Sequence, residues 1–173
     1  MNKILIFLSF TVLLACSGFK SEKQSVNLMI TEYDSLLLEL KSFDIKSAAP
    51  NLKRYNNVIE LSKSKMKKDV LPEIETMNYL NDLKLMRRQF KNAPKIKTQL
   101  VSKINTNKEQ LSNLIVDIDG SVFDQTQLQG ILSEEVNELK SIKKSLIDFK
   151  TAYTVSESRF DSLYLLSNAF NFQ

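Results

Sequence analysis

Apolar residues recur at helical spacing along most of the chain. Between residues 26 and 43 they are separated alternately by three and four positions, in an unbroken seam formed by Val26, Met29, Tyr33, Leu36, Leu40 and Phe43. That alternation places every member on one face of an α-helix, so the pattern predicts a first helix here. We expect residues 44–49 to connect it to the next helix, with Ser47 as the N-cap.

The longest periodic signal lies in the C-terminal third. From residue 128 onward ten of thirteen heptad seam positions are apolar, which predicts one long helix that packs against more than one partner. The seam positions are Leu128, Leu132, Glu135, Leu139, Ile142, Leu146, Phe149, Tyr153, Ser156, Phe160, Leu163, Ser167 and Phe170. Helix propensity falls over residues 151–158, where Thr, Val and Ser crowd together, and we expect a bend or a break there.

The middle of the chain carries shorter stripes. Residues 50–91 form either one helix kinked at Pro72 or two helices, and the pattern leaves both interpretations open. The apolar stripes are Leu52, Tyr55, Ile59 and Met66, then Val70, Ile74, Met77, Leu80, Leu83 and Phe90. Pro94 predicts a clearer break, because proline lacks an amide proton and clashes with the preceding helical turn.

A further helix is predicted over residues 95–118, where Asn107 interrupts the apolar stripe. It should end at Asp119, with Gly120 in the C′ position. Ser121 and Asp124, three residues apart, are then expected to form a capping box for the last helix.

The chain has only 3 glycines and 3 prolines, so few residues interrupt these periodic segments. The predicted fold class is all-α: an elongated antiparallel bundle of four or five helices with a long heptad-patterned C-terminal helix. We expect residues 25–173 to form a single helical-bundle domain.

The N-terminus has a different character. Lys3 is followed by an apolar run over residues 4–14, which is too short to span a membrane as a permanent helix. The segment Leu13-Leu14-Ala15-Cys16 resembles the lipobox of bacterial lipoproteins. The resemblance implies a signal peptide over residues 1–15, cleavage between Ala15 and Cys16, and a lipid on the Cys16 thiol. Residues 16–24 would then be the lipidated cysteine and a short tether.

The same resemblance implies a place in the cell. A lipidated Cys16 would hold the protein on a membrane of the bacterial cell envelope, since two or three acyl chains anchor firmly where one barely does. Ser17, where an Asp would mark retention at the inner membrane, implies an outer-membrane address. The alternative is an ordinary secreted protein in which Cys16 has no special role.

Composition excludes several kinds of chemistry. The chain has no histidine and only 1 cysteine, so it has no Ser-His-Asp triad, no histidine base, no common zinc or haem site and no intrachain disulfide. Glu134, Glu135 and Glu138 could do acid–base work, but a helix N-terminus or the basic middle of the chain explains an acidic cluster better. The Asp117-Ile118-Asp119-Gly120 segment with Asp124 fails the spacing of a calcium loop. We therefore expect no catalytic residue, cofactor or metal.

Charge is unevenly distributed. Net charge is −2 over residues 16–40, +10 over residues 41–108 and −5 over residues 109–173. The candidate anionic-partner patch consists of Lys63, Lys65, Lys67, Lys68, Arg87 and Arg88, with Lys91, Lys95 and Lys97 nearby. Its partner could be anionic lipid headgroups, lipopolysaccharide phosphates or an acidic protein, whereas nucleic acid is not expected. The alternative is a solvated surface with internal ion pairs.

These observations favour a non-enzymatic structural or protein-interaction lipoprotein, which contacts an envelope protein or a second copy of itself. The alternative is a helical carrier with an apolar lumen for a lipid or amphiphile, and an enzyme comes third. Aromatic residues near the C-terminus could form the contact surface, although a place in the core is favoured. These residues are Phe160, Tyr164, Phe170 and Phe172.

Overall fold

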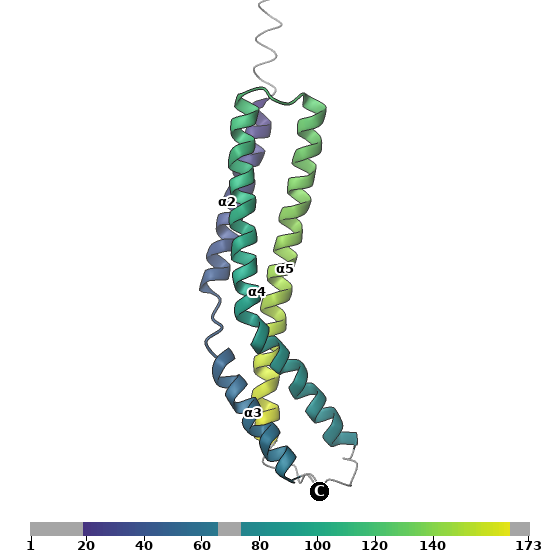
Figure 1. The fold of residues 1–173 in the computed structure, drawn as a ribbon. Coiled ribbons are helices and arrows are strands. Elements are labelled where there is room, and N and C mark those ends of the chain that lie inside the picture. Colours follow the sequence, from purple (N-terminus) through teal and green to yellow (C-terminus); the bar gives the residue numbers. More distant parts are fainter. Residues whose placement is uncertain (1–18, 66–73, 167–173) are drawn as a thin grey trace, which may run out of the picture. The chain divides into compact units, whose positions relative to one another are not determined.

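The computed structural model describes residues 19–65 and 74–166, and within those residues it contains only α-helices and their connections. The helices are α2 (Phe19–Ser42), α3 (Ala48–Lys65), α4 (Ile74–Asp119) and α5 (Gln125–Leu166) (Figure 1). The predicted all-α class is therefore confirmed. No described helix is long and apolar enough to cross a membrane.

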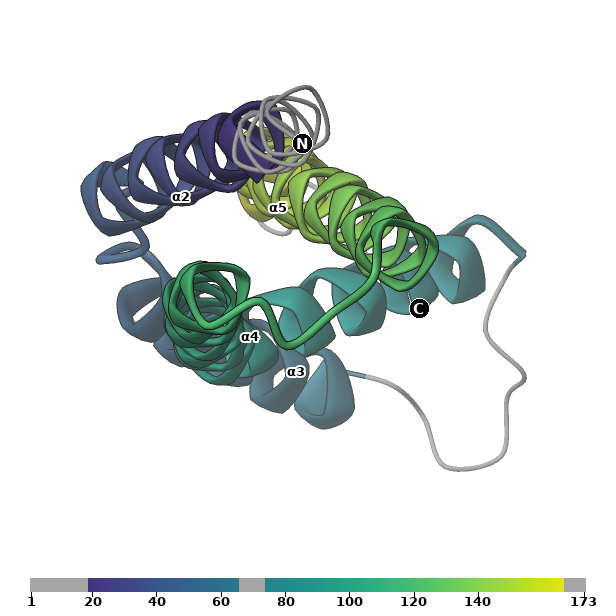
Figure 2. The same ribbon diagram turned by 90° about the horizontal axis from the view of Figure 1, so that it is seen from above.

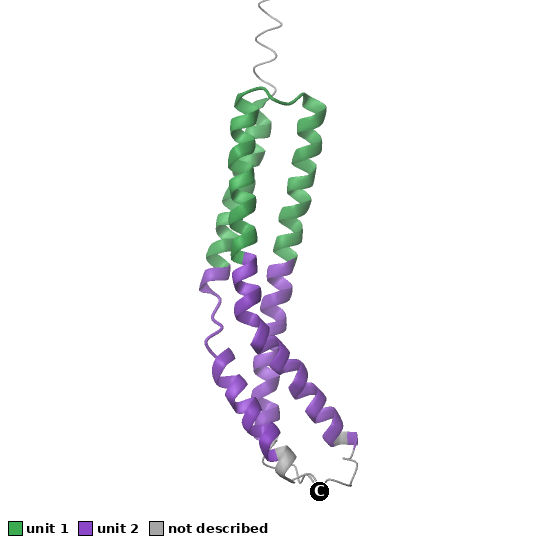
Figure 3. Ribbon diagram, viewed as in Figure 1, with its two compact units in different colours: residues 1–39, 101–144 green, residues 40–100, 145–173 purple. Residues whose placement is uncertain are grey.

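The chain forms two compact units, each built from segments that are distant in the sequence (Figure 3). Unit 1 combines Met1–Glu39 with Val101–Lys144, and unit 2 combines Leu40–Leu100 with Ser145–Gln173. Helices α4 and α5 contribute to both units. The expectation that residues 25–173 form one domain stays a prediction.

Unit 1 is a three-helix bundle of α2 with parts of α4 and α5, and Figure 2 shows these helices from above. Ion pairs fix the helix directions: Lys23 with Asp119 and Asp34 with Lys108 require α2 and α4 to be antiparallel. The predicted first seam points inward, since its members in this unit are at most 5% exposed. The buried apolar residues include Val26, Met29, Tyr33, Leu36, Ile104, Leu111, Leu114, Ile118, Leu128, Leu139 and Ile142.

Unit 2 packs α3 against parts of α4 and α5 around an aromatic core. Phe90 makes edge-to-face contacts with Tyr153 and Phe160, at centroid distances of 5.9 and 5.4 Å. Each such pair contributes about 0.5–1.5 kcal/mol beyond the burial of its surface. Phe160 is 0% exposed, so the favoured place in the core is confirmed for this residue. Phe170 and Phe172 lie outside the described residues.

Helix α4 runs without interruption through Pro94, so the predicted break there is wrong. Proline at this position removes the bond to the carbonyl of residue 90, at a cost of about 3 kcal/mol in a helix interior. Packing outweighs that cost, because Phe90 and Ala93 are at most 1% exposed while Pro94 itself faces outward. The helices α3 and α4 are separate, and Pro72 between them lies outside the described residues.

The predicted apolar stripe at the start of α4 is also partly wrong. Ile74 and Met77 are 78% and 49% exposed, and the chain turns a neighbouring stripe inward instead. Two residues of that stripe carry hydroxyl groups, so the spacing of apolar residues alone does not predict it. The buried residues are Thr76, Tyr79, Leu83, Met86, Phe90 and Ala93.

Helix α4 ends at Asp119 as predicted, but Ser121 rather than Gly120 adopts the left-handed conformation. The φ angle of Ser121 is 52°, and no glycine among the described residues has a positive φ. The amide of Ser121 bonds to the carbonyl of Ile118, and the amide of Val122 bonds to that of Asp117, at 3.1 Å each. These two bonds define a Schellman motif with Ser121 in the C′ position, one residue beyond the predicted one.

The predicted capping box of the last helix is displaced by one turn. Asp124 caps α5: its Oδ1 accepts the amide of Gln127 at 2.9 Å, and Gln127 Oε1 accepts the amide of Asp124 at 3.1 Å. This is the reciprocal pattern of a capping box with Asp and Gln in the two positions. Ser121 is not the N-cap, because it lies four residues before Gln125, where α5 begins.

Helix α5 is continuous over residues 151–158, so the chain does not break there. The helix continues despite the weak propensity of these residues because its seam is packed: Tyr153 is 1% exposed and Ser156 is 9% exposed. Seam positions from Leu128 to Leu163 are all buried or half-buried. Ser167 and Phe170 lie outside the described residues.

Candidate functional site

A row of cations follows the exposed side of α4 within unit 2. We define the basic face as Lys84, Arg87, Arg88, Lys91 and Lys95, all of which are exposed. Residues 84, 88, 91 and 95 follow the four–three–four spacing of one helix face. The opposite side of the helix is fixed in the core by Leu83, Met86 and Phe90, which are at most 4% exposed. Packing on one side therefore aims the cations away from the unit.

The basic face borders a shallow hollow of about 660 Å³. Two amide side chains and an apolar residue contribute to its wall, and Leu85 among them is 63% exposed. The lining consists of Asn81, Lys84, Leu85, Arg87, Arg88, Lys91 and Asn92. Ammonium, guanidinium and amide groups are hydrogen-bond donors, so the hollow is chemically suited to anionic oxygens.

Within the described residues, no ion pair engages the basic face. Several cations elsewhere do form ion pairs: Arg159 bonds to Asp82 at 2.9 Å, Lys143 to Glu32 at 2.7 Å, and Arg54 to Asp161 at 2.6 Å. The contact made by Arg87 is with the ring of Tyr55, 5.5 Å from its centroid, which leaves the positive charge in place. The charge of this face is therefore not neutralised by the described part of the chain.

Of the six residues in the predicted anionic-partner patch, the structure places Arg87 and Arg88 on this face. Lys63 and Lys65 belong to α3, but their side chains lie outside the described part of the structure. Lys67 and Lys68 fall in residues 66–73, which are not described. Sequence reasoning missed Lys84, although its spacing of four residues from Arg88 was visible.

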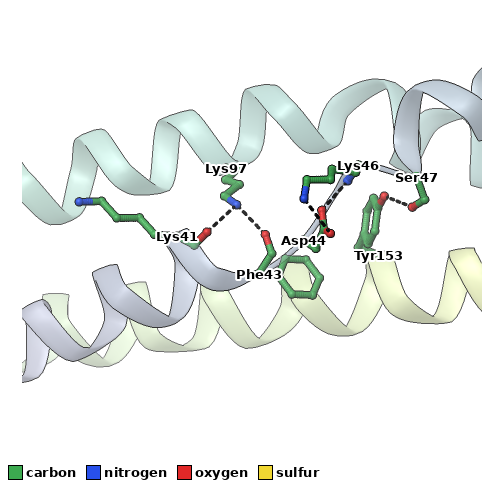
Figure 4. Close-up of polar contacts among 7 residues, drawn as sticks. All are labelled: Lys41, Phe43, Asp44, Lys46, Ser47, Lys97 and Tyr153. Carbon is green, nitrogen blue, oxygen red and sulfur yellow. Dashed lines mark hydrogen bonds and ion pairs between the residues drawn. The ribbon is translucent and has the colours of Figure 1, made fainter.

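Lys97 has a structural role at the connection between α2 and α3 (Figure 4). Its Nζ donates hydrogen bonds to the carbonyl oxygens of Phe43 at 2.6 Å and Lys41 at 3.3 Å. These carbonyl oxygens lie at the end of α2, where the helix supplies no amide donor for them, so Lys97 provides the missing hydrogen bonds.

The same connection is held to α5 by a hydroxyl pair. Ser47 occupies the predicted position before the first residue of α3, and its hydroxyl forms a 2.6 Å hydrogen bond with that of Tyr153 (Figure 4). Burial raises the pKa of Tyr153 despite this hydrogen bond, which acts in the opposite direction. The phenol therefore remains neutral and is suited to positioning the connection.

The acidic cluster at the start of α5 divides into two roles. Glu138 forms an ion pair with Lys103 at 2.6 Å, which is the expected docking of this cluster onto the basic middle of the chain. Glu135 points inward instead, and burial, followed by the charges of Glu138 and Glu134, raises its pKa. Burial, followed by the charges of Glu135, Glu138 and Glu32, raises the pKa of Tyr33 to about 12.

Glu135 belongs to a polar layer in the core of unit 1. Tyr33 Oη, Asn107 Nδ2 and Glu135 Oε2, from α2, α4 and α5, are buried without a hydrogen-bond partner in the described structure. Asn107 is the residue that interrupts the predicted apolar stripe, and it is 6% exposed. Buried polar groups of this kind lower stability by about 1–3 kcal/mol when they remain unpaired.

The acidic residues of the rejected calcium loop have other partners. Asp119 forms an ion pair with Lys23, and Asp124 caps α5. Within residues 19–65 and 74–166, no group of three or more His, Cys, Asp or Glu residues could hold a metal ion.

Ala15 and Cys16, the residues of the predicted cleavage and lipid attachment, lie outside the described part of the chain. No protein-family model, curated protein or solved structure matches this sequence.

Proposed function

We propose that the protein is a lipid-anchored lipoprotein of the bacterial envelope whose helical bundle is a non-enzymatic interaction module. The observation that supports it most is the exposed basic face of α4, which has no ion-pair partner in the described residues. The lipobox-like segment that ends at Cys16 supports the anchor, and Ser17 after it supports the outer-membrane address.

A row of unpaired cations favours an anionic partner for a physical reason. Neighbouring like charges repel one another, and Lys84, Arg88 and Lys91 share one side of a single helix. An anionic surface in contact with this face offsets the repulsion with attraction. Salt screens this attraction between exposed charges, and the Debye length at physiological ionic strength is about 8 Å. Binding through this face should therefore weaken as salt concentration rises.

Two measurements in cells test the proposal. Replacing Cys16 with Ser should remove the lipid and shift the protein out of the membrane fraction at high salt, where contacts between exposed charges are screened. A photo-crosslinking residue at Asn81, beside the basic face, should capture envelope molecules that the same probe at exposed Gln110 of unit 1 does not. Membrane retention of the serine variant, with no site difference in crosslinking, would contradict both parts of the proposal.

A further inference from the structure

We propose that the basic face of α4 is a second membrane contact, which binds the phosphodiester headgroups of anionic phospholipids. This inference rests on the proposed function, because it assigns a ligand to the same face. It goes beyond it by naming the chemistry: a lipid surface rather than an acidic protein.

The first argument is the mixture of residues on the exposed side of the helix. Ile74, Met77 and Leu85 are 78%, 49% and 63% exposed, and they lie on the same side as Lys84 and Arg88. At about 100° per residue, these positions fall opposite the buried stripe through Leu83 and Phe90. A helix with cations and apolar residues on one exposed side is suited to a membrane interface, where apolar groups enter the headgroup region and cations meet phosphates.

The second argument is the sign and density of charge. Residues 81–97 contain six cations and one acid, Asp82, which is already paired with Arg159 at 2.9 Å. Guanidinium groups such as those of Arg87 and Arg88 match the geometry of phosphate oxygens, and lysine supplies additional positive charge. Each near-surface cation strengthens binding to an anionic membrane about fivefold.

Vesicle binding by the chain from Ser17 to Gln173 tests this inference, since that chain contains every described helix and has no lipid. Vesicles of phosphatidylglycerol and phosphatidylcholine in equal parts should bind it, and vesicles of phosphatidylcholine alone should not. Replacing Lys84, Arg88, Lys91 and Lys95 together with Gln should weaken binding roughly several-hundred-fold, with a shallower dependence on salt.

A matched variant separates the face from net charge. Lys20, Lys53, Lys140 and Lys144 are also exposed and are scattered over the other helices, so replacing these four with Gln removes the same charge. This variant should lose less than about tenfold in vesicle binding. Replacing Leu85 with Ser should weaken binding without changing its salt dependence. Circular dichroism should show unchanged helix content in all three variants.

The outcomes distinguish this inference from the proposed function. Equal losses in the two four-residue variants would show that net charge, not the face, determines binding, and would overturn the inference. Absence of binding to anionic vesicles, together with a protein crosslinked through Asn81 in cells, would overturn it in favour of an acidic protein and leave the proposed function intact. If the chain neither bound anionic vesicles nor yielded a protein crosslinked through Asn81, both this inference and the proposed function would be refuted.

Discussion

The left-handed residue between α4 and α5 permits a test of the fold at the level of one backbone angle. Ser121 has a φ of 52°, whereas Gly120 has no positive φ. A non-glycine residue in the left-handed region is disfavoured by about 1–2 kcal/mol. Replacing Ser121 with Gly should therefore raise the free energy of unfolding by about 1 kcal/mol, after allowance for the greater freedom of glycine in the unfolded chain.

Gly120, next to Ser121, allows the converse substitution, in which glycine is replaced. A Cβ at position 120 would meet its nearest atoms, the carbonyl oxygen of Val116 and Cγ2 of Val122, at 3.5 Å each, which is ordinary contact. Replacing Gly120 with Ala should therefore be tolerated and should stabilise the chain by about 0.5 kcal/mol. If Gly120 instead held the left-handed position, as the usual preference for glycine at a helix end suggests, both Ser121→Gly and Gly120→Ala would destabilise the chain.

Thermal unfolding followed by circular dichroism is the assay. A gain of 1 kcal/mol corresponds to a rise in Tm of roughly 2–4 °C for a chain of this size. Replacing exposed Ser133 in the interior of α5 with Gly is the matched control, and it should lower Tm because glycine weakens a helix interior. Destabilisation by Ser121→Gly, or by Gly120→Ala, would refute the assignment of the left-handed position.

Two further substitutions probe the helix interiors. Burial raises the pKa of Glu135 from its ordinary value of 4.5, so its contribution to stability is complete below that pH and is lost as pH rises through the folded-state pKa. Glu135→Gln should consequently stabilise the protein by about 1 kcal/mol at pH 7 and have no effect near pH 4. Urea unfolding at the two pH values measures this difference. An equal effect at both pH values would contradict a buried carboxyl that titrates between them. Pro94→Ala restores an amide donor in the interior of α4 and should raise Tm, with a stabilisation of up to about 3 kcal/mol. A lower Tm would mean that the helix depends on the proline geometry.

Periodicity predicted much of the fold because each helix buries one continuous face. The seam from Val26 to Leu40 and the seam of α5 required only the spacing of apolar residues, and both are buried or half-buried in the structure. The start of α4 was less predictable, since apolar residues occur on both of its sides. There Tyr79 and Thr76 turn inward, while Ile74 remains exposed.

Local signals failed where tertiary packing prevailed. Pro94 ordinarily ends a helix, but the buried side of α4 at Phe90 and Ala93 holds it together. The observed caps lie one position or one turn from the predicted ones, because both Gly120 and Ser121 can end a helix. Such displacements are common for helix ends, where several residues can satisfy the same backbone groups.

The candidate site was predictable in charge but not in geometry. The sequence indicated that residues 41–108 are strongly basic, yet it did not show which cations would be paired. The structure assigns Lys97 to the end of α2, whereas Lys84, Arg88 and Lys91 remain exposed on one side of α4. Pairing depends on the distances between helices, which the sequence alone does not contain.

Depth-sensitive fluorescence tests the central claim, contact between the basic face and an anionic membrane, most directly. The chain from Ser17 onward has no cysteine, so Asn81→Cys and Gln110→Cys each provide a unique site for an environment-sensitive fluorophore. With phosphatidylglycerol-containing vesicles, the label at residue 81 should shift to shorter wavelength, and the label at residue 110 should remain unchanged. Equal shifts at both sites, or a shift at residue 110 alone, would contradict the claim.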